Sequence, residues 1–159
     1  MEMTEQARIR RLQDTLSITG VGVIALTAWS LAKTTMFFML FDEATQRELY
    51  KLSEDIPMEV FYIVFAVLAL IDFMIRLYVG LSARAEGNGK RKGFVYLAVA
   101  VVLVIASVVY IILVFCGFAS FPSEIDLIMT VVFEATSIAT LILMIFCAIR
   151  LRRLTEFAG

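Results

Sequence analysis

The chain has 159 residues, of which 61% are hydrophobic and 18% are charged, and its mean hydropathy is +0.90. Apolar residues make up only about half of a soluble domain, so this composition excludes a soluble globular protein and predicts a membrane protein surrounded by the lipid bilayer. The net charge of −1, without a sustained basic surface that interleaves aromatic residues, argues against nucleic acid as a partner.

The sequence contains no histidine, which excludes a Ser-His-Asp triad, a Cys-His dyad and the usual zinc sites. Its two cysteines, Cys116 and Cys147, do not form a CxxC motif, and the topology argued below places them near opposite faces of the membrane. A disulfide needs Cα atoms within about 7 Å, so these two cannot pair. We therefore expect no catalytic residue, no metal and no cofactor, and a protein that is not an enzyme.

The first long apolar run, 15–41, exceeds the ~20 residues that cross the hydrocarbon core and holds a single charge, Lys33. Three arginines before this run, together with the triplet Ser30-Leu31-Ala32, resemble a signal peptide with its cleavage site. The apolar run continues past Lys33, however. We therefore expect a retained membrane helix.

An acidic segment, 42–57, separates the first apolar run from the second. Leu49, Leu52 and Ile56 recur in it at helical spacing, which predicts a short amphipathic helix on the outer surface. Pro57, at its end, is favourable at the start of the next helix.

The second apolar run, 58–81, carries Asp72 and Arg76 four residues apart, so that the two side chains share one face of a helix and can pair. Arg76 lies closer to the inner interface and can also extend its guanidinium to the lipid headgroups. The segment 82–93 follows, rich in glycine and in basic residues. It predicts a short cytoplasmic loop.

The third run, 94–118, is uncharged and rich in valine and isoleucine, a composition typical of strands in water. Its length of 25 residues favours a membrane helix instead. The fourth run, 125–149, is interrupted in its interior by Glu134 and ends in a basic tail. The sequence therefore predicts four membrane spans.

The distribution of lysine and arginine predicts the orientation of these spans. The N-terminal segment, the 82–93 loop and the C-terminal tail hold ten of these residues, and the two opposite connections hold two. Cytoplasmic segments carry the excess, so both termini are expected in the cytoplasm. Because short connections make consecutive helices neighbours, we expect one domain over 1–159, an all-α antiparallel up-down four-helix bundle in the cell membrane.

Ionisable side chains inside a span cost about 2.5–3.5 kcal/mol each to insert, so each needs a partner or a purpose. At a rise of ~1.5 Å per residue, Lys33 and Glu134 lie at similar depths, ~12 and ~13 Å below the outer ends of their helices. We predict an ion pair between them, with Tyr110 of the third span available to donate a hydrogen bond to the carboxylate. Such a pair serves equally as a clamp between helices or as a functional site.

Asp72 also has two interpretations. In one it forms only a structural pair with Arg76. In the other it is the inner station of a proton or cation path whose outer station is Glu134, since a relay needs acids at two depths. Serine and threonine stripes beside these acids fit a polar path, although in lipid such residues more often hydrogen-bond between packed helices.

Two classes of function follow. The first is a small, oligomeric channel or transporter for ions, protons or a small solute, which uses the intramembrane charges. The alternative is a non-catalytic accessory protein that binds other membrane proteins. Small residues at Ala25, Ala28, Ala32, Ala135 and Ala139 permit close approach of helices, within the chain or between copies. The expected partners are the bilayer and either a second copy or another membrane protein.

Overall fold

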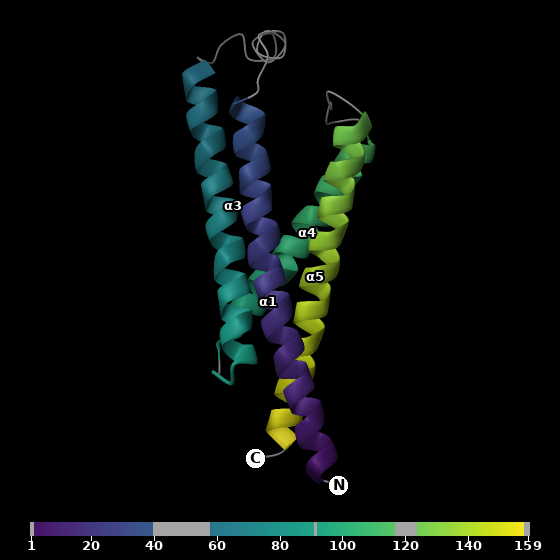
Figure 1. Cartoon of the computed structure of the whole chain (residues 1–159). Helices are drawn as coiled ribbons and strands as arrows, with labels where there is room; N and C mark the ends of the chain where they lie inside the picture. The colour runs from purple at the N-terminus through teal and green to yellow at the C-terminus, as the bar shows by residue number, and fades with distance from the viewer. Residues whose placement is uncertain (1, 40–57, 91, 117–123, 158–159) are drawn as a thin grey trace.

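The computed structural model of the chain describes residues 2–39, 58–90, 92–116 and 124–157. The described residues are all-helical and contain no strand, and their four helices are α1 (Glu2–Met39), α3 (Met58–Gly87), α4 (Val95–Phe115) and α5 (Glu124–Phe157) (Figure 1). Each helix is long and apolar enough to cross a membrane, which indicates a multi-pass membrane protein. The amphipathic helix predicted within 42–57 lies outside the described residues.

Three helices extend further than the predicted spans, all at the end of the molecule where both termini lie (Figure 1). We call this the terminal end. There α1 begins at residue 2 instead of 15, α3 ends at 87 instead of 81, and α5 ends at 157 instead of 149. The expected 82–93 loop is correspondingly short, with a turn around Gly89, whose φ of +82° suits glycine. Hydropathy marks where apolar sequence stops, whereas backbone hydrogen bonds continue a helix through charged residues.

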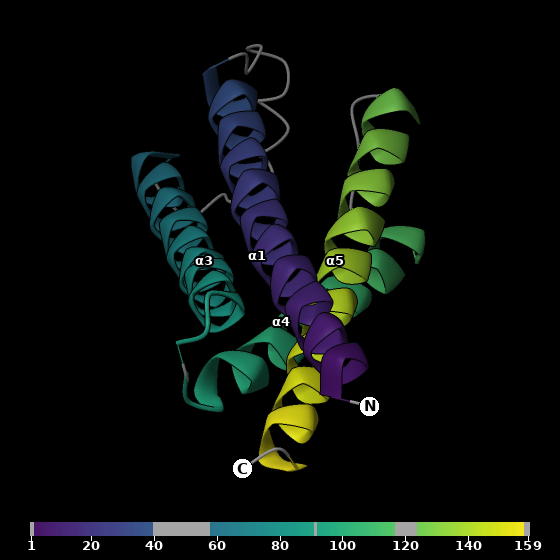
Figure 2. The same cartoon turned by 60° about the horizontal axis from the view of Figure 1, so that its bottom comes forward.

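The helices form two pairs that diverge away from the terminal end (Figures 1 and 2). The most extensive contact joins α1 to α3, followed by that between α1 and α5. Helix α4 begins beside α3 and ends beside α5 (Figure 1). The buried apolar core lies toward the terminal end, since it draws on residues 16–23, 79–83, 96–103 and 141–151. Large apolar side chains are exposed along all four helices, as expected where lipid is the solvent.

Glycines allow the close contact between α1 and α3. A Cβ atom on Gly20 would lie 2.7 Å from the carbonyl oxygen of Gly80, and one on Gly87 would lie 2.7 Å from the carbonyl oxygen of Gln13. These distances leave no room for a side chain, so the two backbones approach directly. The five alanines expected to permit close approach, within the chain or between copies, are exposed, and none of them lies in the core between helices, so contacts between copies stay a prediction.

Candidate functional site

A first polar layer lies within the spans and joins α3 to α5 through Arg76. Its Nε donates to the two carboxylate oxygens of Asp72 at 3.1 and 2.9 Å, and its Nη1 donates to Ser137 Oγ at 3.0 Å. The guanidinium of Arg76 therefore contacts the neighbouring helix α5. From the sequence, an extension of the guanidinium to the lipid headgroups was the other possibility. Its side chain is 17% exposed and that of Asp72 is 47% exposed, so the acid remains accessible from one side.

A small polar cavity of about 40 Å³ borders Asp72 between α1 and α3. Thr27 and Ser30 of α1 contribute its polar lining, and the Thr27 hydroxyl donates to the carbonyl of Val23 in its own helix at 2.6 Å. One water molecule needs roughly 10–15 Å³ of such volume, so the cavity has room for water beside the carboxylate. Serine and threonine side chains of the first helix therefore line a space next to Asp72.

Glu134 lies on α5 three residues before Ser137, roughly one helical turn from the serine that binds Arg76. Its Oε2 atom is buried and has no hydrogen-bond partner within the described part of the chain, and the same holds for Ser107 Oγ on α4. Desolvated polar atoms without partners are costly, so they mark places where another group is to be expected. Glu134 is thus the least satisfied acid of this layer.

The surroundings of Glu134 include one of the predicted site residues, Tyr110. Tyr110 lies within electrostatic range of the carboxylate, yet no hydrogen bond joins the two among the described contacts. The side chain of Lys33 lies outside the described residues, so its pairing with Glu134 stays a prediction. Trp29 of α1 stacks on Phe133 of α5 with ring centroids 5.6 Å apart, which holds the two helices together beside Glu134.

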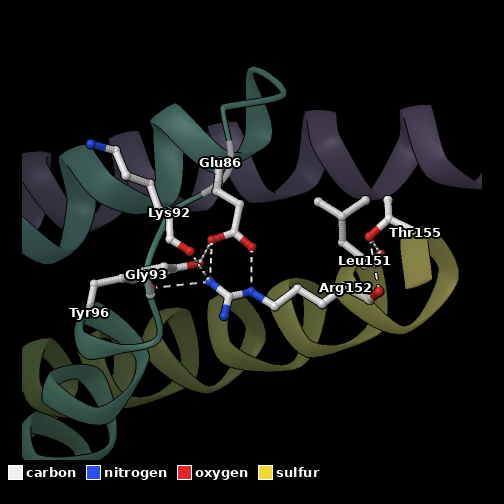
Figure 3. A network of polar contacts seen from close by, with 7 residues as sticks. All are labelled: Glu86, Lys92, Gly93, Tyr96, Leu151, Arg152 and Thr155. Carbon is white, nitrogen blue, oxygen red and sulfur yellow. Dashed lines mark hydrogen bonds and ion pairs between the residues drawn. The ribbon is translucent and has the colours of Figure 1, made fainter. Parts of the chain in front are cut away.

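A second polar layer at the terminal end was not expected from the sequence (Figure 3). Arg152 of α5 donates from Nε and Nη2 to the two carboxylate oxygens of Glu86, both at 2.7 Å, and the Tyr96 hydroxyl donates to Glu86 Oε2 at 2.6 Å. Glu86 is 7% exposed and Tyr96 is 1% exposed. This bidentate, charge-assisted arrangement joins α3, α4 and α5.

Arg152 also holds the connection between α3 and α4. Its Nη2 donates to the carbonyl oxygens of Lys92 at 2.9 Å and Gly93 at 3.3 Å, and its guanidinium carbon lies 5.5 and 5.7 Å from the ring centroids of Phe94 and Tyr96. The guanidinium of Arg152 therefore pairs with a buried acid, donates hydrogen bonds to two carbonyls and makes cation–π contacts with two aromatic rings.

One weak signal for this second layer is present in the sequence. Glu86 is the only acid within 82–93, among four basic residues. A single acid in such a segment indicates a solvated loop, and the position of Arg152 near the C-terminus indicates a basic tail. Their pairing depends on the extension of α3 and α5 beyond the predicted spans, which hydropathy did not reveal.

No protein-family model, curated protein or solved structure matches the chain.

The two polar layers differ in chemistry. The second layer is internally satisfied, with each Glu86 oxygen bound by a donor, which suits a structural tie. The first layer has an accessible acid, a bordering cavity and a carboxylate oxygen without a partner. Within the described ranges, no three His, Cys, Asp or Glu side chains gather as a metal site.

Proposed function

We propose that the chain is a small, non-catalytic transport protein of the cell membrane that moves protons or small cations along a path through Glu134 and Asp72. The observation that carries this proposal is the buried Oε2 of Glu134, which has no hydrogen-bond partner among the described residues. An ionisable group within a span is costly to insert, and a buried carboxylate oxygen that accepts no hydrogen bond from the described residues favours a group that binds or exchanges ions. Further copies of the chain would complete the path across the bilayer.

The connection between the two acids supports a relay. Arg76 binds Asp72 on α3 and Ser137 on α5, and Glu134 lies about one turn from Ser137. A proton or cation that leaves Glu134 therefore meets a hydroxyl and then a second acid beside a cavity that can hold water.

The proposed assembly is an antiparallel four-helix bundle with both termini in the cytoplasm. A cysteine introduced at Asn88, in a Cys116→Ala/Cys147→Ala background, is expected to react with a membrane-impermeant maleimide only after permeabilisation. A cysteine at Ser53 or Ser123 is expected to react in intact cells, because the opposite connections lie outside. Reaction at position 88 in intact cells would show that the protein has the opposite orientation, with both termini outside.

We further propose that Lys33 is the partner of Glu134. The stack of Trp29 on Phe133 supports this, because Glu134 adjoins Phe133 and Lys33 follows Trp29 by about one helical turn.

The pair predicts a non-additive change in stability. Lys33→Met and Glu134→Gln are each expected to lower the free energy of unfolding by about 3 kcal/mol, because each leaves one charge in the span without its partner. The double variant is expected to regain most of this loss. Thermal unfolding in detergent measures all three, and losses that simply add would show that the two residues do not pair.

Reconstituted protein tests the transport proposal. In proteoliposomes with an internal pH- or cation-sensitive dye, the unmodified protein is expected to dissipate an imposed gradient of protons or of sodium or potassium ions. Absence of movement for each of these ions, in both directions, would remove the proposal. That result would favour the alternative, an accessory protein that binds other membrane proteins. Cross-linking from the exposed Ala135 and Ala139 would then be expected to capture a different membrane protein.

A further inference from the structure

A larger cavity of about 410 Å³ opens at the terminal end, between the first turns of α1, the α3–α4 connection and the last turns of α5. This volume falls within the ~300–1,000 Å³ typical of ligand sites. Residues from all three segments line it, among them Gln13, Glu86, Lys90, Lys92 and Arg152. It lies where α3 ends and α4 begins, at the border of the candidate spans Tyr62–Gly87 and Val95–Phe115. Membrane spans end near the lipid headgroups, so we expect headgroups at the level of this cavity.

The charge of the lining is positive. Lys90, Lys92 and Arg152 supply three cations against the single acid Glu86. Both oxygens of that acid already accept hydrogen bonds, from Arg152 and from Tyr96, so its charge is neutralised within the protein (Figure 3). The two lysines are exposed, and neither ammonium group forms an ion pair with any described residue. The cavity therefore has a surplus of two positive charges.

Two of the lining residues have further donors. Arg152 uses Nε and Nη2 for Glu86 and the loop carbonyls, and its Nη1 donates to no group in the described part of the chain. The side-chain amide of Gln13 is likewise without a partner among the described contacts. A phosphate group presents several anionic oxygens and is bound in proteins by arginine, by lysine and by neutral N–H donors.

We propose that this cavity binds the phosphate group of an anionic ligand, held by Lys90, Lys92, Gln13 and the free Nη1 of Arg152. The Glu86 pair fixes the orientation of Arg152, a lining residue, through Nε and Nη2, and leaves Nη1 without an acceptor in the described part of the chain. Two sources supply this chemistry, the headgroup of an anionic phospholipid and a soluble phosphate. The site does not depend on the transport proposal, because it uses neither Glu134 nor Asp72.

A ligand that binds the folded protein raises its unfolding temperature, and Trp29, the only tryptophan, reports unfolding by fluorescence. In uncharged detergent at constant ionic strength, phosphatidylglycerol is expected to raise the unfolding temperature by roughly 5 °C relative to phosphatidylcholine. Inorganic phosphate, compared with chloride, forms the second arm. A rise with phosphatidylglycerol alone identifies the lipid as the source, and a rise with inorganic phosphate as well identifies a site open to soluble phosphate.

Matched variants separate a built site from general surface charge. Lys90→Gln/Lys92→Gln is expected to lose most of the shift, whereas Arg8→Gln/Arg10→Gln, which removes two exposed charges from the same end outside the cavity, is expected to keep it. Neither variant alters Glu86 or Arg152. Equal shifts in the two variants would overturn the proposal, and so would the absence of any shift in the unmodified protein.

Discussion

Replacement of Arg152 by alanine is expected to lower the free energy of unfolding by about 3–5 kcal/mol, because it leaves the buried carboxylate of Glu86 without its cation. The same change removes the donor to the carbonyls of Lys92 and Gly93. Arg152→Lys is expected to restore only part of the loss, since an ammonium group cannot reproduce the bidentate contact with Glu86. Thermal unfolding in detergent, followed by the fluorescence of Trp29, measures each variant.

The neighbouring Arg153 provides the control. It is exposed and takes part in none of the contacts of the second layer, so Arg153→Ala is expected to change the stability by no more than about 0.5 kcal/mol. Removing both charges, in Glu86→Gln/Arg152→Gln, is expected to cost less than either single change, because no buried charge is left unpaired. Equal unfolding temperatures for Arg152→Ala and Arg153→Ala would show that the Glu86 pair does not tie the helices together.

The four membrane helices could be predicted because each depends on a local property, an apolar run long enough to cross a bilayer. Their ends could not. In 82–93, glycines and basic residues indicated a loop, yet α3 continues to Gly87 and only a short turn follows. Charged residues end a span without ending a helix, because the backbone hydrogen bonds are satisfied within the helix in either solvent.

The contacts between site residues also fall into two groups, those that local sequence spacing predicts and those that it does not. Asp72 and Arg76 are four residues apart, and spacing within one helix suffices to bring them together. The contact from Arg76 to Ser137 spans 61 residues of sequence and that from Arg152 to Glu86 spans 66, so both depend on how the helices are placed against one another. The sequence contains both partners of each contact but offers no periodicity that joins them.

The second large effect concerns transport. Glu134→Gln and Asp72→Asn keep the size and shape of each side chain but cannot ionise, so each is expected to abolish ion movement in proteoliposomes. Asp72→Asn also leaves Arg76 without its carboxylate, so its folding requires an independent check by thermal unfolding. Ser137→Ala, which removes the hydroxyl between the two acids, is expected to slow movement without abolishing it.

Glu124→Gln is the matched control, because it alters an exposed acid at the first residue of the same helix, α5. Its flux is expected to equal that of the unmodified protein. If all three acid-to-amide variants reduced flux equally, the effect would come from net charge and not from a path through the span.

The most direct measurement is the initial rate of dye response in proteoliposomes that contain equal amounts of folded unmodified, Glu134→Gln or Glu124→Gln protein. A path through Glu134 predicts rapid movement for the unmodified and Glu124→Gln proteins, and only the background leak of protein-free liposomes for Glu134→Gln. Movement through Glu134→Gln at the unmodified rate would contradict the account, because Glu134 would then have no part in transport.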